Sequence, residues 1–331
     1  MDDAPASSVA TDSSPWPPSE RAALCGKYIE IFALRNRTDE GAVDGQKQLF
    51  ASTPSALLRH EIAYALGQMQ RLDAVPFLSQ LLTDTSEDPV VRHEAAEALG
   101  AIGEPASIEL LRKHATDAAP EVSDTCSLAL ARLEYHIDKG MCACEKRPQE
   151  VLRLEHEQRA RDAAEPHEHA PAAAVAVGGF VSVDPAPAAP AAPTRMLRAQ
   201  LLDTSRPLFE RYRALFALRD AVPAKGEEAV NAICAAFSDT NALLKHEVAF
   251  VLGQLEHSAS VAPLCDVISC ESEHPMVRHE AAEALGAIGS PEAIGVLHRY
   301  AEHECDLLRE SVWVALHMYD REAFLAKGVC V

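Results

Sequence analysis

The chain has 331 residues, of which 48% are hydrophobic and only 5% are aromatic, and its formal net charge is −20. This size supports one large or two ordinary domains, and the abundance of Ala, Leu and Glu favours helix over sheet. The negative charge excludes nucleic acid as an expected partner, because no basic stripe could collect phosphates against it. No segment reaches the ~20 apolar residues that a membrane span requires.

Residues 1–20 are acidic and rich in Ser and Pro, so we expect a disordered N-terminus. They lack the basic and apolar regions of a targeting peptide. The nine cysteines form no disulfide framework, and Cys142 and Cys144 are the only close pair. This pattern indicates reduced thiols. We expect a soluble protein of the cytoplasm, with the nucleus as a second compartment.

An internal repeat dominates the rest of the sequence. "VRHEAAEALGAIG" begins at Val91 and again at Val277, 186 positions later (277 minus 91). Four segments with the pattern His-Glu-x-Ala-x-x-Leu-Gly align without gaps, and they begin at His60, His93, His246 and His279. Degenerate copies that lack His–Glu extend the register, around Tyr28, Asp124, Tyr212 and Glu310. Each half therefore consists of four units.

Each unit is predicted to be a helical hairpin. Asp88 is a suitable N-cap, Pro89 suits the first turn and Gly103 is a stop signal, with apolar residues at helical spacing between them. A second helix is expected from Pro105, and its counterpart from Pro291. Because such short pairs cannot bury their apolar faces alone, they must stack. The predicted fold is an all-α solenoid of two pseudo-symmetric four-repeat halves, residues 21–144 and 196–325.

The segment between the halves, residues 145–195, contains "HEHAPAAAVAVGGFVSVDPAPAAPAAP". Its Ala/Pro-rich composition predicts a flexible linker. The histidines at 167 and 169 resemble a ligand cluster but lie outside the repeat register, and the pair of Cys142 and Cys144 has no second cysteine pair. We therefore assign neither group a function. No P-loop, dinucleotide fingerprint or Ser–His–Asp pattern is present.

The His–Glu pairs are the candidate functional residues. A single pair of this kind is usually solvated, but four copies at one register serve no packing purpose, because the outer units do without them. Stacking places His60–Glu61 beside His93–Glu94, and His246–Glu247 beside His279–Glu280. Four imidazoles and four carboxylates between two walls are a ligand set for two metal ions.

The ligand types narrow the choice of metal without deciding it. The lack of cysteine argues against structural zinc, and mixed nitrogen and oxygen ligands suit iron or manganese. Two-metal hydrolysis with zinc or magnesium stays an alternative. Glu97 and Glu283, four residues after His93 and His279, are either partners that orient the imidazole rings or ordinary surface glutamates.

The repeats, the four His–Glu motifs, "VSVDPAP" and "SRPLFERYRALFALR" together resemble the deoxyhypusine hydroxylase family. The resemblance covers about residues 20–143 and 180–322, and its motifs are specific. It implies HEAT-like hairpins and a non-haem di-iron monooxygenase that uses O2. The implied reaction hydroxylates the deoxyhypusine side chain of translation initiation factor 5A.

The resemblance also implies roles for the motif residues. One iron would be held by His60, His93 and Glu94, and the other by His246, His279 and Glu280. Glu61 and Glu247 would engage the cationic substrate rather than bind iron directly. A carboxylate-lined cleft on an acidic protein suits an amine-rich substrate. We expect a monomer.

Two other functions fit the same repeats. The main alternative is a non-catalytic HEAT-repeat scaffold that binds a basic partner through its acidic concave face. A chromophore lyase or chaperone of the related repeat class is a further option. The scaffold predicts that replacing His60 or His279 leaves metal content and partner binding unchanged, whereas the di-iron enzyme predicts about two irons per chain.

Overall fold

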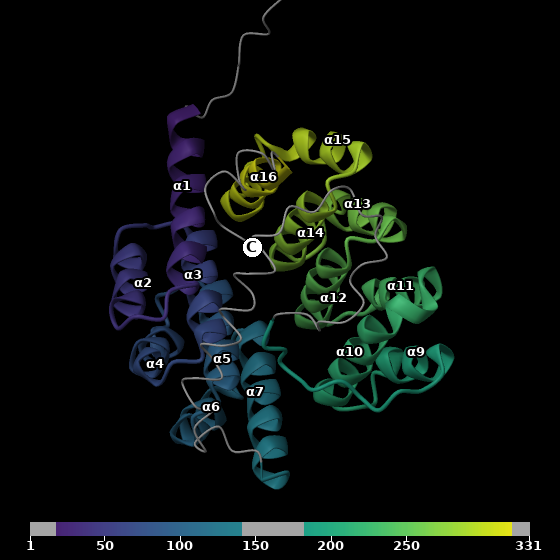
Figure 1. Ribbon diagram of the computed structural model, residues 1–331, viewed down its shortest axis with the longest axis horizontal. Helices are drawn as coiled ribbons and strands as arrows, with labels where there is room; N and C mark the ends of the chain where they lie inside the picture. The colour runs from purple at the N-terminus through teal and green to yellow at the C-terminus, as the bar shows by residue number, and fades with distance from the viewer. Residues whose placement is uncertain (1–17, 141–181, 320–331) are drawn as a thin grey trace, which may run out of the picture.

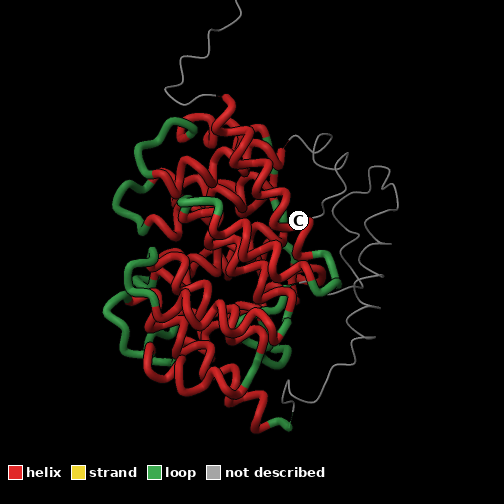
Figure 2. Tube along the Cα trace, turned by 90° about the vertical axis from the view of Figure 1, so that its left-hand side faces the viewer, coloured by secondary structure: helices red, strands yellow, loops and turns green. Residues whose placement is uncertain are grey.

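The computed structural model describes residues 18–140 and 182–319. Within these ranges the chain forms α-helices and short 3-10 turns joined by loops, and no strand (Figure 2). The all-α prediction is confirmed. Of the predicted disordered start, residues 1–17 lie outside the described part of the chain, and the first helix already begins at Pro18.

Helices of the first half alternate between an inner and an outer layer (Figure 1). The inner helices are α1 (Pro18–Arg35), α3 (Ala56–Met69), α5 (Pro89–Ile102) and α7 (Pro120–Asp138). The outer helices are α2 (Gly41–Ala51), α4 (Val75–Thr83) and α6 (Ile108–His114). Successive inner helices pack side by side and form one wall, in which the His-bearing turns of α3 and α5 are neighbours.

The second half repeats this arrangement (Figure 1). Its inner helices are α10 (Leu208–Lys225), α12 (Ala242–Leu255), α14 (Pro275–Ile288) and α16 (Asp306–Tyr319). Its outer helices are α9 (Thr194–Leu202), α11 (Glu227–Cys234), α13 (Val261–Ser269) and α15 (Pro291–Tyr300). An outer helix therefore precedes the first inner helix of this half, which the hairpin prediction did not include.

The helix ends follow the local signals of the sequence. The Asp88 side chain caps α5 by accepting a hydrogen bond from the Val90 amide, and Pro89 occupies the first turn. The helix stops at Gly103, whose φ of 76° lies in the left-handed region that glycine adopts without strain. The apolar residues between these signals are buried in the core. The predicted boundaries of this repeated helix are confirmed.

The two halves meet at both of their ends. Helix α1 packs on α16, and α7 packs on α10, so the inner helices enclose the space between the walls (Figure 1). At one junction the Ser55 hydroxyl donates to Glu310 Oε2 at 2.5 Å. At the other, Asn241 Nδ2 donates to Asp124 Oδ2 at 2.7 Å. Because these partners are related by the same offset of 186 (241 minus 55 and 310 minus 124), the halves face each other with approximate two-fold symmetry.

Residues 182–189, which we call the strap, bridge the halves. Gln68 of α3 accepts a hydrogen bond from the Val183 amide at 2.7 Å, and Gln254 of α12 donates to the Ser182 hydroxyl at 2.8 Å. Arg219 of α10 donates to both carboxylate oxygens of Asp184, at 2.8 and 2.7 Å. The strap falls within the predicted linker of residues 145–195. Within the described part of that range, specific polar contacts hold residues 182–184 in place. Residues 145–181 lie outside the described part.

None of the helices in the described ranges is both long and apolar enough to span a bilayer.

Candidate metal centre

The four His–Glu pairs converge between the facing walls, from α3 and α5 on one side and α12 and α14 on the other. The ring centroids of His60 and His93 are 5.5 Å apart, and those of His246 and His279 are 5.3 Å apart. Across the walls, the His60 ring lies 5.1 Å from that of His279. All four imidazoles are buried, with His93 and His279 at 0% exposure. These pairs are therefore not the solvated pairs of an ordinary helix surface.

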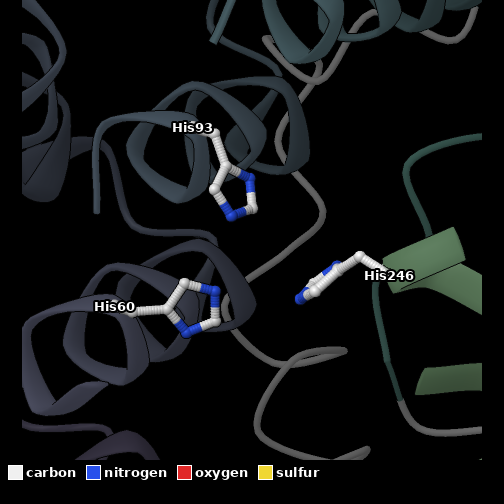
Figure 3. Close-up of side chains that lie close together, drawn as sticks. All are labelled: His60, His93 and His246. Atoms are coloured by element: carbon white, nitrogen blue, oxygen red, sulfur yellow. The ribbon is translucent and has the colours of Figure 1, made fainter. Parts of the chain in front are cut away.

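Figure 3 shows three of these rings, His60, His93 and His246, directed toward one another from both walls. One ligand nitrogen of each lies within 4.8 Å of the others. A second group with the same spacing consists of His246, His279 and Glu280. The second group consists of the three residues that the family resemblance implies as one set of ligands. The first group contains His246 instead of the expected Glu94.

Glu94 nevertheless lies next to this first group. Its Oε2 is 3.3 Å from Nε2 of His60, and the same contact joins Glu280 to Nε2 of His246 at 3.3 Å. The other ring nitrogen of His60, Nδ1, is 3.1 Å from Oε1 of Glu61. Each predicted set of ligands is thus gathered within one wall, while the histidines also approach across the gap.

Several buried polar atoms of these pairs have no hydrogen-bond partner in the described part of the chain. They are both ring nitrogens of His93 and of His279, Nε2 of His60 and of His246, and Oε1 of Glu247. Leaving such groups unpaired in a buried site costs free energy. Four imidazoles with free nitrogens among buried carboxylates would be satisfied by cations. The residues present therefore fit bound metal ions.

The close packing of buried imidazoles and carboxylates also shifts their pKa values. Burial, and then the neighbouring imidazoles, lower the pKa of His93 and of His279 well below the usual range, which favours the neutral ring that binds metal. For His60, burial lowers the pKa, but the adjacent carboxylates of Glu61 and Glu94 raise it overall. Burial and adjacent carboxylates raise the pKa of Glu247 well above its usual range. Additional positive charge would relieve this repulsion.

On the carboxyl-terminal side of the histidines, side chains fill the space between the walls. One turn further along α3 and α12, the rings of Tyr64 and Phe250 meet edge to face with centroids 6.1 Å apart. One turn further still, Gln68 and Gln254 hold the strap across the gap. The carboxyl-terminal ends of these helices are thus sealed by two successive layers.

The opposite side is open. A cleft of about 770 Å³ lies at the amino-terminal ends of the inner helices. Leu58 and Met276, in the turns that precede the histidines, contribute to its wall. Five acidic residues line this cleft, namely Glu20, Asp88, Glu121, Asp306 and Glu310. They outnumber its basic residues, Lys27 and Arg309. The lining of this cleft is therefore predominantly acidic.

The two glutamates proposed as orienting partners differ. Oε1 of Glu283 is 3.7 Å from Nδ1 of His279. In the described residues of the first half, no such ion-pair contact joins Glu97 to His93. Burial raises the pKa of both carboxyl groups well above the usual range, so neither is an ordinary surface glutamate. Cys142, Cys144 and the histidines at 167 and 169 lie outside the described part of the chain.

Sequence reasoning missed three features of the site. In the sequence, Tyr28 only marks a repeat unit that lacks His–Glu, yet its hydroxyl donates a hydrogen bond to Glu283 of the other half. Tyr64 occupies a helical position one turn after His60, and that spacing could have identified it. Asp184 lies inside the quoted motif "VSVDPAP", but the Ala/Pro-rich surroundings concealed its structural role.

The comparisons with known proteins agree with this arrangement. The model for HEAT repeats matches residues 44–131 and 230–317. Human deoxyhypusine hydroxylase is 44% identical over 299 residues, covering 90% of this chain and 87% of the relative. This chain belongs to the deoxyhypusine hydroxylase family. The family member from Neurospora crassa is 40% identical over 326 residues, covering 95% of this chain and 91% of the relative.

A solved structure extends the family relationship to the fold. The human deoxyhypusine hydroxylase in complex with glycerol has a TM-score of 0.75 and 41% identity, and the match covers 92% of this chain and 96% of that chain. The predicted resemblance to this family and its HEAT-repeat fold are both confirmed. Members of the family are enzymes, so the enzymatic interpretation holds over the scaffold.

Proposed function

We propose that this chain hydroxylates the deoxyhypusine side chain of translation initiation factor 5A at a non-haem di-iron centre, with O2 as co-substrate. The observation that carries the proposal is the convergence of four buried His–Glu pairs, in a chain that is 44% identical to human deoxyhypusine hydroxylase. At least one ring nitrogen of each histidine lacks a hydrogen-bond partner in the described residues. Two sets of residues would hold the irons, namely His60, His93 and Glu94, and His246, His279 and Glu280.

Iron suits the reaction as well as the ligands. Hydroxylation of an unactivated C–H bond requires an oxidant that amino-acid side chains cannot supply, and bound iron supplies it with O2. The protein would hold the metals, orient one carbon of the substrate and exclude water. Tyr64, Phe250 and the strap close the site on one side, which leaves the acidic cleft as the entrance for substrate.

Glu61 and Glu247 are proposed to engage the amines of the substrate. The two are not equivalent, because Glu61 already contacts Nδ1 of His60 at 3.1 Å. Glu247 is 3% exposed, and its Oε1 is buried without a hydrogen-bond partner in the described residues. A substrate ammonium group would satisfy this oxygen in a charge-assisted hydrogen bond. Glu247 is therefore the better placed of the two to receive an amine.

The direct test supplies the iron-loaded full-length chain with deoxyhypusine-containing initiation factor, a reductant and isotopically labelled O2. The expected result is one labelled oxygen atom on the deoxyhypusine residue, detected by mass spectrometry, with no product after the metal is removed by a chelator. Product formation at the same rate by metal-free protein would contradict the proposal. A scaffold would bind the factor but incorporate no oxygen.

The assignment of the substrate amine is tested by comparing Glu247→Gln with Glu61→Gln. We expect Glu247→Gln to raise the KM by roughly tenfold, because a charge-assisted hydrogen bond becomes a neutral one, while iron content is unchanged. Glu61→Gln should have the smaller effect on KM. Equal KM values for the parent and Glu247→Gln would remove Glu247 from substrate binding.

A further inference from the structure

Tyr28 links the two halves at the edge of the metal centre. It lies on α1 at the repeat position that His60 and His93 occupy on their helices, and it is 3% exposed. Its hydroxyl donates to Oε2 of Glu283, on α14 of the other half, at 3.4 Å. The ring packs against Phe32 with centroids 4.9 Å apart, so packing and the hydrogen bond are separate contributions.

Glu283 in turn faces a histidine of the metal centre. Its second oxygen, Oε1, lies 3.7 Å from Nδ1 of His279, and both atoms are buried without a hydrogen-bond partner in the described residues. The Ser311 hydroxyl is also near this carboxylate but does not complete a hydrogen bond to it. In metal sites, a carboxylate at the second ring nitrogen fixes the orientation of the ligand histidine and raises its basicity.

In the part of the chain that the structure describes, the corresponding pair of the first half, His93 and Glu97, has no such tyrosine from the second half. Tyr212 of α10 also has a buried hydroxyl, but this hydroxyl donates to the backbone carbonyl of Leu243 at 3.0 Å. It therefore cannot hold Glu97, and the described residues contain no ion-pair contact between Glu97 and His93. Among the described residues, the tyrosine–glutamate–histidine series therefore forms at His279 and not at His93.

We propose that Tyr28 is a positioning residue, which holds Glu283 against His279 and makes the metal at His246, His279 and Glu280 the more firmly bound of the two. This inference rests on the proposed di-iron centre. It makes the two metals inequivalent although their ligands are the same, because the difference comes from the residues behind the ligands. The half that donates the tyrosine is not the half that holds the metal.

The test measures the release of iron to a chelator from the full-length chain, with thermal stability measured in parallel. The parent should release its two irons in two phases. Tyr28→Phe keeps the ring and removes only the hydroxyl, and it should accelerate the slower phase by roughly fivefold, as expected for one lost hydrogen bond. Tyr212→Phe is the matched control and should leave both phases unchanged.

A second variant separates positioning from packing. Glu283→Ala should accelerate the slow phase by about tenfold or more, and adding Tyr28→Phe to it should have no further effect, because the tyrosine acts through this carboxylate. Additive effects of the two substitutions would overturn the inference. So would two irons released from Tyr28→Phe at the parental rates. A parent chain that binds no iron would instead contradict the proposed metal centre itself.

Discussion

In the first half, α3 and α5 present their His–Glu pairs to the centre of the molecule, and α12 and α14 of the second half present the same pairs 186 residues later. The inward-facing residues are thus nearly identical in the two halves. The supporting residues behind them are not. Tyr28 reaches across to Glu283, whereas Tyr212 remains bound to the backbone of its own half.

A second difference lies on the outer side of the same helices. Arg92 donates to both carboxylate oxygens of Asp117, and both side chains are largely buried. The corresponding arginine, Arg278, keeps the contact to the preceding backbone carbonyl, but His303 stands where Asp117 would be. One terminal nitrogen of Arg278, Nη2, is therefore buried without a hydrogen-bond partner in the described residues.

These differences show that the two halves share the residues that face the centre of the molecule but differ in the residues that lie behind them. The His–Glu pairs that face the centre are the same in both halves, as the proposed pair of metal sites requires. Residues that stabilise each wall have changed, because several local solutions support one helix position. Variants at paired positions can therefore distinguish the shared function from the separate stability of each half.

The largest effect is expected from the ligands themselves. His93→Ala and His279→Ala should each lose one iron and reduce the rate of hydroxylation by at least about 100-fold, more than the usual loss from an outer-shell residue. Helical content, measured by circular dichroism, should change little in either variant. If only one of the two substitutions impaired hydroxylation, the walls would not be functionally equivalent.

Next in size is the loss of the buried ion pair of the first half. Asp117→Ala should lower the free energy of unfolding by about 3 kcal/mol, because Arg92 would remain buried without its partner. His303→Ala, at the equivalent position, should cost only about 1 kcal/mol, since it removes a capping contact to the Cys305 amide. Urea denaturation of both variants measures the difference. Asp117 makes the same capping contact, to the Ala119 amide, so equal losses would show that the ion pair contributes nothing beyond it.

The same pair predicts a pH dependence. The hydrogen bond from Arg92 holds the pKa of Asp117 well below its usual range. Because the folded-state pKa is depressed, the stabilisation is complete above the unfolded value of about 4 and is lost as the pH falls through the folded value. The gap in stability between the parent and Asp117→Ala should therefore narrow in acid, and a gap that widened there would contradict this account.

A smaller difference is expected where helices cross at glycine. A Cβ at Gly286 would lie 2.7 Å from Cα and 2.9 Å from the carbonyl oxygen of Ala315, whereas at Gly100 the Cα of Ala129 would be 3.2 Å away. Backbone atoms cannot move aside as side chains do. Gly286→Ala should therefore destabilise the fold by about 2 kcal/mol and Gly100→Ala by about 1 kcal/mol. The reverse order in thermal denaturation would show that the first half packs more tightly.

The smallest effect is expected from a substitution that gives the second half the ion pair of the first. His303→Asp should keep the cap on the Cys305 amide and give Arg278 a carboxylate, which raises the free energy of unfolding by about 0.5–1 kcal/mol. The matched control is the same substitution in an Arg278→Lys background, where the two-point contact cannot form. An equal gain in both backgrounds would assign the effect to capping alone.

Much of this architecture could be predicted from the sequence because it is repeated. The offset of 186 aligned the His–Glu pairs, and the Asp88, Pro89 and Gly103 signals located one helix at both ends. Stacking of neighbouring repeats predicted that the two His–Glu pairs of each half lie side by side. Residue type and spacing sufficed wherever one repeat resembles the next.

The unpredicted features are those that depend on contacts between distant parts of the chain. No local sequence signal indicates that Tyr28 forms a hydrogen bond with Glu283, 255 residues away. Nor does any indicate that Asp184 of the strap pairs with Arg219 of α10. The Ala/Pro-rich composition around the strap predicts flexibility, but composition does not reveal a few well-placed polar partners. The approach of His246 to His60 and His93 likewise depends on how closely the walls meet.

The central claim, one metal held by each wall, is tested most directly by anomalous X-ray diffraction at the iron edge from crystals of the iron-loaded chain. The account predicts two peaks per chain, one next to His60, His93 and Glu94 and the other next to His246, His279 and Glu280. A single peak among His60, His93 and His246 would contradict it, because one ion shared across the walls would then replace the pair.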